Sequence, residues 1–406
     1  MRVLVVGSGG REHALAWKLR QSPTVEEVHA APGNPGIAAL GECHPIRAED
    51  GESLLALART LSADLVVVGP EAPLVAGVAD QLRRGGVAVF GPSAAAARIE
   101  GSKGFAKEVL NAAGVPTAER LSVARVPCVV KADGLAAGKG VYICRTEEEL
   151  SAALRAVASF GDQFVIEELL EGEELSLFAL VDGSEVLALP ESRDYSRVGD
   201  GDTGPNTGGM GSYSPVPELD PAQVAELVDT VHRPVVAELA ERGTPFIGCL
   251  YAGLMLTGDG PRVLEFNCRF GDPETQTILP RIEGDLAEAL ASCAAGDLGE
   301  VELGMAETAA VTVVLAAGGY PEGRDAGSPI EGVDAAEGEG ALVFHAGTAR
   351  RDGQLLTSGG RILNVTGLGD TLEEARANAY DACGKISFPD ARFRSDIAAK
   401  AVNVAG

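Results

Sequence analysis

Glu265 and Asn267 stand two positions apart near the end of an apolar run. In an extended strand, residues two apart share one face, so both side chains should point the same way. Carboxylate and amide oxygens suit Mg²⁺, which takes one or two protein carboxylates and completes its shell with phosphates and water. The spacing favours a magnesium site. A polar face on an edge strand is the alternative if no phosphate-binding element accompanies it.

A glycine- and lysine-rich segment, residues 131–140, separates two further apolar runs. Glycines let a backbone close over phosphate oxygens, and Lys131 and Lys139 supply positive charge at both ends. Its spacing differs from that of a P-loop, and Gly140 stands where Ser or Thr would hold magnesium. A flexible hairpin with surface lysines is the alternative, but Lys131 ends an apolar run, where a solvated lysine is less expected.

An acidic turn follows the apolar run 164–168 and includes Glu167, Glu168 and Leu169. Exposed backbone groups at such a turn can bind the edge of an adenine, and a carboxylate further along can accept both ribose hydroxyls. By itself this pattern is weak, because acidic turns usually face solvent.

Other familiar motifs are incomplete. Gly7 and Gly9 begin a dinucleotide-binding pattern, but Glu12 replaces its third glycine and the second strand lacks the acid that binds a ribose, which argues against an NAD-dependent dehydrogenase. What remains is a glycine turn that opens a helix, either a phosphate site or a plain tight turn. The five histidines are dispersed and are expected to be structural. We find no motif for a covalent nucleophile.

Composition narrows the class of protein. The net charge of -26 over 406 residues argues against binding to nucleic acid or to an anionic membrane. Seven scattered cysteines without a C-x-x-C pair fit reduced thiols. We see no signal peptide and no apolar run that could span a membrane, so we expect a cytoplasmic protein.

Alternating strands and helices must position these residues. Strands expected at 3–6, 25–30, 65–68 and 87–90 predict a parallel α/β sheet, whose ligands gather at the carboxyl ends of its strands. Further strands are expected at 128–131, 141–144, 164–168, 250–256 and 262–267, with a hairpin over 174–189. Helices are expected at 103–113, from Pro221, and last in the chain after Thr371. Residues 190–217 have little hydrophobic periodicity and are expected to form a loop, which at that length is usually either functional or disordered.

Together these elements resemble the ATP-grasp superfamily, and within it the phosphoribosylamine–glycine ligases. The resemblance covers essentially the whole chain in order and rests on residues 9–14, 32–34, 69–71, 101–103, 202–211, 265–274 and 316–321. A sibling ATP-grasp enzyme of purine synthesis that activates formate or bicarbonate lacks the 202–211 segment. A nucleotide-binding module without catalysis is the alternative from another class.

The resemblance implies a fold and a reaction. A Rossmann-like parallel-sheet domain would span 1–100, an ATP-grasp core of two α+β subdomains would comprise 101–120 with 190–310 and a lid at 121–189, and a small C-terminal α/β domain would span 311–406. The implied enzyme uses ATP and Mg²⁺, or Mn²⁺, to join glycine to 5-phosphoribosylamine through glycyl phosphate. No obligate protein partner is implied.

The resemblance also implies roles, carried over by position. ATP should meet Lys103, Lys131, Asp133, Gly134, Gly138, Lys139, Gly140, Glu167, Glu168, Leu169 and Glu174. Glu265 and Asn267 should bind the metal ion. The substrates should meet Gly9, Gly10, Arg11, Asn34, Glu71, Asn206, Gly208 and Gly209, with Arg269, Asp272 and Asp202 as catalytic residues. Two departures from the family are a short segment at 121–126, and Tyr195-Ser196 where His-Lys is usual, so Tyr195 and Ser196 receive no role.

Overall fold

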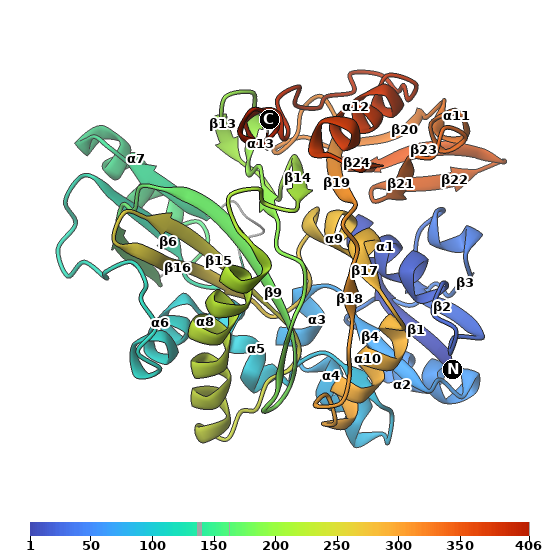
Figure 1. The fold of residues 1–406 in the computed structure, drawn as a ribbon, viewed down its shortest axis with the longest axis horizontal. Coiled ribbons are helices and arrows are strands. Elements are labelled where there is room, and N and C mark those ends of the chain that lie inside the picture. The colour runs from blue at the N-terminus through green and yellow to red at the C-terminus, as the bar shows by residue number, and fades with distance from the viewer. Residues whose placement is uncertain (136–139, 162, 406) are drawn as a thin grey trace.

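The N-terminal part of the chain forms a parallel sheet, as predicted. In this computed structural model, which describes residues 1–135, 140–161 and 163–405, its strand order is β3-β2-β1-β4-β5 (Figure 1). The strands are β1 (Arg2–Gly7), β2 (Glu27–Pro32), β3 (Glu42–Cys43), β4 (Leu65–Val68) and β5 (Val89–Phe90). β2 lies two residues later than expected, because its pairing with β1 continues as far as Gly7 and Pro32.

Both faces of this sheet are covered. The connecting helices are α1 (Gly10–Leu19), α2 (Gly51–Leu61), α3 (Glu71–Val75), α4 (Val78–Arg84) and α5 (Ala94–Gly101), with a short 3₁₀ turn at Ile37–Ala39. Alternate residues of β1 enter different cores: Leu4 and Val6 pack in one cluster, and Val3 and Val5 in another. Burial on two sides explains why these strands are almost continuously apolar.

A small antiparallel sheet, β7-β6-β8, stands apart at one side of the molecule (Figure 1). Its strands are β6 (Cys128–Ala132), β7 (Val141–Cys144) and β8 (Phe164–Glu168), and α7 (Glu147–Val157) packs on it. Thr146 and Glu149 form a capping box at the start of α7. We refer to these four elements as the lid.

A second antiparallel sheet, β10-β9-β15-β16, borders the lid. Its strands are β9 (Glu173–Asp182), β10 (Val186–Ala188), β15 (Ile247–Thr257) and β16 (Gly260–Asn267). α6 (Lys103–Ala112) and α8 (Pro221–Glu241) pack against it, and Asp220 caps α8. The predicted hairpin of β9 with β10 is confirmed, but β9 pairs on its other side with β15 and not with the lid sheet.

The stretch 190–217 contains four short strands where a loop was expected. They are β11 (Arg193–Asp194), β12 (Arg197–Gly199), β13 (Thr203–Asn206) and β14 (Gly211–Ser214). β14 is held by pairing with β19 (Ala309–Ala316), about a hundred residues further along the chain. Local hydrophobic periodicity carries no signal for such distant pairing, which is why the prediction was wrong.

The C-terminal part completes a five-stranded sheet, β11-β14-β19-β24-β21, and adds a three-stranded sheet, β20-β23-β22. Its elements are β20 (Asp325–Pro329), α11 (Val333–Glu337), β21 (Leu342–His345), β22 (Thr348–Arg351), β23 (Gln354–Gly359), β24 (Arg361–Gly369) and α12 (Leu372–Cys383). Thr371 caps α12 as predicted. However, α12 is not the last helix, because α13 (Ala399–Ala405) follows; seven residues are too few for a clear helical period.

The remaining elements connect β16 to β19. They are α9 (Glu274–Ile278), a 3₁₀ turn at Leu279–Arg281, β17 (Ile282–Glu283), α10 (Leu286–Ala295) and β18 (Gly304–Met305). Among the described residues, no helix has the length and apolar character needed to cross a bilayer.

Candidate active site

Glu167 lies between two lysines under the lid sheet. Its carboxylate contacts Lys131 Nζ at 2.7 Å and Lys107 Nζ at 2.9 Å, and its side chain is 2% exposed. Lys107 also donates to Thr117 Oγ1 at 2.7 Å and to the Ala118 carbonyl at 2.6 Å. Burial lowers the pKa of Lys107, and Glu167 opposes that shift. The Glu167 side chain therefore has both lysines as internal partners, and sequence reasoning did not single out Lys107.

Lys131 connects the lid to the strand that carries the expected metal ligands. From β6 its ammonium donates to the Leu264 carbonyl of β16 at 3.0 Å, directly before Glu265. The structure therefore places Lys131, the first residue of the glycine- and lysine-rich segment, beside the strand of Glu265 and Asn267.

Asp133 ties the start of the glycine-rich segment to α6. Its carboxylate accepts from the Lys103 backbone N–H at 2.5 Å and from Ser102 Oγ at 3.3 Å. Lys103 Nζ donates to the Gly134 carbonyl at 3.3 Å. Gly134 has φ +103°, a backbone conformation that favours glycine.

The rest of that segment is only partly described. The carbonyl of Gly140 accepts from the Ala132 N–H at 2.8 Å, which closes the hairpin of β6 and β7. Gly138 and Lys139 lie outside the described residues.

The acidic turn after β8 is partly used in the fold. Glu168 accepts from Arg262 Nη1 at 2.9 Å and from the Glu119 N–H at 2.8 Å. Leu169 follows it, half-buried, at the end of β8. Glu174 is the second residue of β9 and lies opposite Met255.

Asn267 and Glu265 share one face of β16, as their spacing predicted. Asn267 Nδ2 donates to Glu265 Oε1 at 3.4 Å; the carboxylate is exposed, whereas the amide is buried. The atoms that these two residues could offer to a metal ion are the carboxylate oxygens of Glu265 and the amide oxygen of Asn267. This set fits a hard cation such as Mg²⁺, which Glu265 and Asn267 would hold.

Two carboxylates, Glu174 and Asp194, interact electrostatically with Glu265, and a third, Glu274, interacts with Asp194. Desolvation raises the pKa of Glu174, reinforced by Glu265 and Asp202. Desolvation together with Glu174 and Glu265 raises the pKa of Asp194 to about 7. Burial, with a contribution from Asp194, raises the pKa of Glu274 to about 8. These carboxyl groups disfavour one another's charge, a situation that a bound cation relieves.

Arg269 connects the end of β16 to the parallel sheet. Its guanidinium contacts Glu71 Oε2 and Glu100 Oε1, each at 3.1 Å, and donates to Asn267 Oδ1 at 3.2 Å. Burial opposes ionisation of Glu71, but Arg269 and Arg11 hold its pKa at about 2. Burial raises the pKa of Glu100 although Arg269 acts in the other direction. Glu100 was not expected from the sequence.

Four of the expected substrate residues, Gly9, Gly10, Arg11 and Asn34, make close internal contacts at the start of α1 and after β2. The Gly9 N–H donates to Glu12 Oε2 at 2.6 Å, and Arg11 is buried with Nε on Glu12 at 2.6 Å and Nη1 on the Phe270 carbonyl at 3.1 Å. A Cβ on Gly10 would lie 2.2 Å from Asn364 Nδ2. The amide of Asn34 accepts from the Gly36 and Ile37 N–H groups and donates to the Ser8 and His345 carbonyls.

Arg361 of β24 joins the glycine-rich stretch before β14 to Asp272. Its guanidinium donates to the carbonyls of Gly208 and Gly209 and to the Asp272 carbonyl at 2.7 Å. It also contacts Asp272 Oδ2 at 3.2 Å. Sequence reasoning missed Arg361, because no local pattern distinguishes it from other strand arginines.

Asp202 lies in the turn between β12 and β13, with φ +56°. It pairs with the buried Arg394 at 2.9 Å, and Arg394 also pairs with Asp396 at 2.7 Å. Asn206 ends β13 opposite Arg197. The C-terminal segment thus fixes the turn that carries Asp202.

Comparison with known proteins gives matches along nearly the whole chain. The models of the phosphoribosylglycinamide synthetase N domain, ATP-grasp (A) domain and C domain match residues 1–100, 101–275 and 310–400. A phosphoribosylamine–glycine ligase of Streptomyces coelicolor is 51% identical over 417 residues, and one of Agrobacterium fabrum is 48% identical over 419; each alignment covers 99% of both chains.

Solved structures agree with these matches. The crystal structure of phosphoribosylamine–glycine ligase from Thermotoga maritima superimposes with a TM-score of 0.84 at 36% identity, covering 98% of this chain and 100% of that one. The biotin carboxylase domain of a Hydrogenobacter thermophilus 2-oxoglutarate carboxylase has a TM-score of 0.72 at 18% identity, covering 100% of this chain and 93% of its own, which shows a shared fold alone. The chain therefore belongs to the phosphoribosylamine–glycine ligase family of ATP-grasp proteins.

Proposed function

We propose that the chain ligates glycine to 5-phosphoribosylamine at the expense of ATP, giving glycinamide ribonucleotide, ADP and phosphate in purine biosynthesis. One observation carries the proposal beyond family membership: Lys131 reaches from the lid to the strand of Glu265 and Asn267. This contact brings cations for a triphosphate and oxygen ligands for its metal ion to one place.

ATP would lie between the lid and the sheet that contains β16. Lys103, Lys131 and the segment from Asp133 to Gly140 would meet its phosphates, and the backbone after Glu167 would meet adenine, with Glu174 near the ribose. ATP-grasp enzymes generally use ATP with Mg²⁺, and Glu265 and Asn267 supply ligands suited to Mg²⁺ or Mn²⁺. The ion, when bound, neutralises charge on the transferring phosphoryl group.

The γ-phosphoryl group would pass to the glycine carboxylate, forming glycyl phosphate. The amine of phosphoribosylamine would then attack the acyl carbon and expel phosphate, a far better leaving group than oxide. Such a transfer depends on positioning and charge neutralisation more than on a protein nucleophile. Arg269 would orient the glycine carboxylate or the transferring phosphoryl group. Asp272, through Arg361, would hold the segment of Gly208 and Gly209 in place. Asp202 would help to bind glycine and the acyl phosphate from the turn between β12 and β13.

The two substrates would meet different elements. Asn206, Gly208 and Gly209 would bind glycine beside Asp272. The phosphate of phosphoribosylamine would lie at the start of α1, near Gly9, Gly10 and Arg11, where the first backbone N–H groups of a helix and the helix dipole favour an anion. Asn34 and Glu71 would lie near its sugar. Since Arg11 is buried between Glu12 and Phe270, it would act on the phosphate mainly by its charge.

We divide the chain into an N-terminal domain (1–100), a large ATP-grasp subdomain, a lid and a C-terminal domain (311–406). The lid would run from 121 to about 172 and not to 189, because β9 and β10 belong to the sheet of β15 and β16. The large subdomain would then comprise 101–120 and 173–310.

ADP release by the purified chain with Mg²⁺ and ATP tests the reaction. Glycine and freshly made phosphoribosylamine are omitted in turn. Release that requires both substrates is expected, and slow release with glycine alone would reveal hydrolysis of the acyl phosphate. If ATP binds but no combination of substrates releases ADP, the assigned reaction is wrong.

A further inference from the structure

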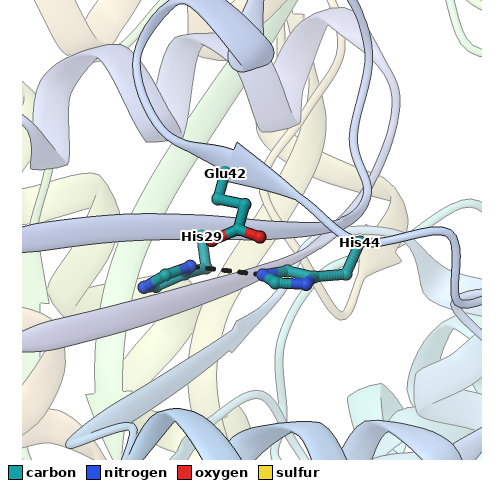
Figure 2. Close-up of side chains that lie close together, drawn as sticks. All are labelled: His29, Glu42 and His44. Atoms are coloured by element: carbon teal, nitrogen blue, oxygen red, sulfur yellow. Dashed lines mark hydrogen bonds between the residues drawn. The ribbon is translucent and has the colours of Figure 1, made fainter.

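Three side chains capable of binding a metal meet at the edge of the N-terminal sheet, apart from the residues described above. They are His29 on β2, Glu42 on β3 and His44 directly after β3, and one ligand atom of each lies within 4.8 Å of the others (Figure 2). The dispersed histidines of the sequence gave no indication of this meeting, which the parallel pairing of β2 with β3 creates.

Backbone register explains the arrangement. His29 and Glu42 are direct partners across β2 and β3. Glu42 and His44 are two residues apart and therefore lie on one side of the edge strand, whereas Cys43 between them lies on the other. Consistently, Cys43 packs toward Gly33, and the His44 N–H continues the ladder to the Ala30 carbonyl at 2.8 Å. Figure 2 shows the Glu42 carboxylate pointing toward the space between the two rings.

The distance between the rings matches a shared metal ion. His29 Nδ1 and His44 Nε2 are 3.2 Å apart. Two nitrogens bound tetrahedrally to one Zn²⁺, each at its usual bond length, are about 3.3 Å apart. In the metal-free protein, one N–H can donate across this gap. For both nitrogens to face a cation, His44 carries its proton on Nδ1 instead.

The surroundings of His29 select the correct nitrogen. Its Nε2 lies 3.3 Å from Glu27 Oε2, and the same oxygen lies 3.3 Å from Arg2 Nε. A carboxylate that accepts the Nε2–H leaves the lone pair on Nδ1, facing His44. This carboxylate–histidine arrangement is the usual second layer of a metal site. His29 is buried and thus fixed in place, whereas the exposed Glu42 can turn to complete the ligand set.

We propose that His29, His44 and Glu42 bind Zn²⁺ or a similar borderline divalent cation, with a fourth position open to water. Two imidazoles and one carboxylate suit such ions, whereas Mg²⁺ prefers oxygen ligands only. The site is therefore chemically distinct from Glu265 and Asn267. A bound ion joins the edge strand β3 to β2 and so closes the segment 33–41, which contains Asn34.

Calorimetric titration of the full chain with Zn²⁺, in excess Mg²⁺ to occupy oxygen-rich sites, tests the proposal. One Zn²⁺ per chain is expected. His29→Gln and His44→Gln should each lower the affinity about 100-fold, while Glu42→Gln and Glu27→Gln should lower it about 10-fold, the scale of losing one supporting group. Glu49→Gln, an exposed glutamate nearby, is the matched control and should leave the affinity unchanged.

Cobalt absorption identifies the ligand atoms. Co²⁺ in the wild-type chain should give visible ligand-field bands without a thiolate charge-transfer band, and Cys43→Ser should change neither. Circular dichroism verifies folding of the histidine variants, and Glu42→Gln alters only an exposed side chain. Zn²⁺ uptake that survives both histidine substitutions, uptake that Cys43→Ser removes, or no uptake by the wild-type chain would each overturn the proposal.

Discussion

Two groups of carboxylates lie beside the 265–274 segment, and they differ in whether a protein cation faces them. Glu71 and Glu100 share Arg269, which helps to hold the pKa of Glu71 at about 2 and opposes the rise that burial gives the pKa of Glu100. Asp194 and Glu274 mainly feel burial and other carboxylates, and their pKa values are raised to about 7 and about 8. The first group is satisfied by the folded chain itself, whereas the second carries a surplus of negative charge that a cation can balance.

Glu265→Ala gives the largest expected effect, because it removes a proposed metal ligand from the second group. Turnover should fall about 1,000-fold, the scale of losing one essential electrostatic contact. Nucleotide affinity should fall only when Mg²⁺ is present. ADP release and nucleotide titration with and without Mg²⁺ measure both effects. Asp259→Ala, at the exposed turn between β15 and β16, is the control; full activity of Glu265→Ala would contradict the metal assignment.

Arg269→Met tests the first group. Turnover should fall about 100-fold because the proposed orienting cation is lost. Stability should fall by about 3 kcal/mol because Glu71 and Glu100 lose their common partner. Urea denaturation measures the stability. Adding Glu100→Gln should restore part of the stability but none of the turnover; recovery of both would make Arg269 purely structural.

Lys107→Met should have a smaller effect, because Lys131 still pairs with Glu167. The KM for ATP should rise about 10-fold, a cost of about 1.4 kcal/mol, as the lid loses its tie to α6. Glu108→Gln, its exposed neighbour on the same helix, serves as the control. An unchanged KM for ATP would show that Lys107 does not contribute to nucleotide binding.

The smallest effect concerns pH. Asp194 and Glu274 bind protons more tightly when folded, so without metal they stabilise the fold at low pH, and this contribution is lost as pH rises from about 4 to about 8. Glu71 acts in the opposite sense, and its contribution is lost as pH falls below 4.5 toward about 2. Urea midpoints across this range, with EDTA or Mg²⁺, measure the change.

Glu274→Gln is the control for the pH experiment. This variant should flatten the metal-free profile in the range from about 4 to about 8, and Mg²⁺ should stabilise the wild-type chain more at pH 8 than at pH 5. Equal stabilisation by Mg²⁺ at both values would show that the second group of carboxylates does not respond to the cation.

The fold was predictable where the signal is local. β4, β7 and β8 have the predicted bounds, because short apolar runs end at glycine, proline or charged residues. The strands within residues 190–217 were not predictable, because β14 pairs with the distant strand β19. The small strands of that stretch contain glycine, serine and asparagine, which carry no strand period of their own.

The site was predictable in its residue types but not in its pairings. Strand alternation places Glu265 and Asn267 on one face from the sequence alone. The side chains of Asn34 and Glu167 bind partners within the protein, and no local sequence pattern predicts those contacts. Lys107 had one available signal, since it lies among the buried residues Phe105, Ala106 and Val109 of α6. Arg361 and Arg394 had none, because Asp272 and Asp202, which they join to the rest of the site, lie far away in sequence.

The position of β14 in the sheet of β19 and β24 also sets an order of events during synthesis. All five strands of the parallel sheet lie within the first 90 residues, so this sheet has its complete set of strands early in translation. Gly208, Gly209 and β14 leave the ribosome about a hundred residues before β19, their partner strand. The segment with Gly208 and Gly209 therefore has only its earlier partner β11 at that stage, and its contacts with β19 and Arg361 form after those residues have been made.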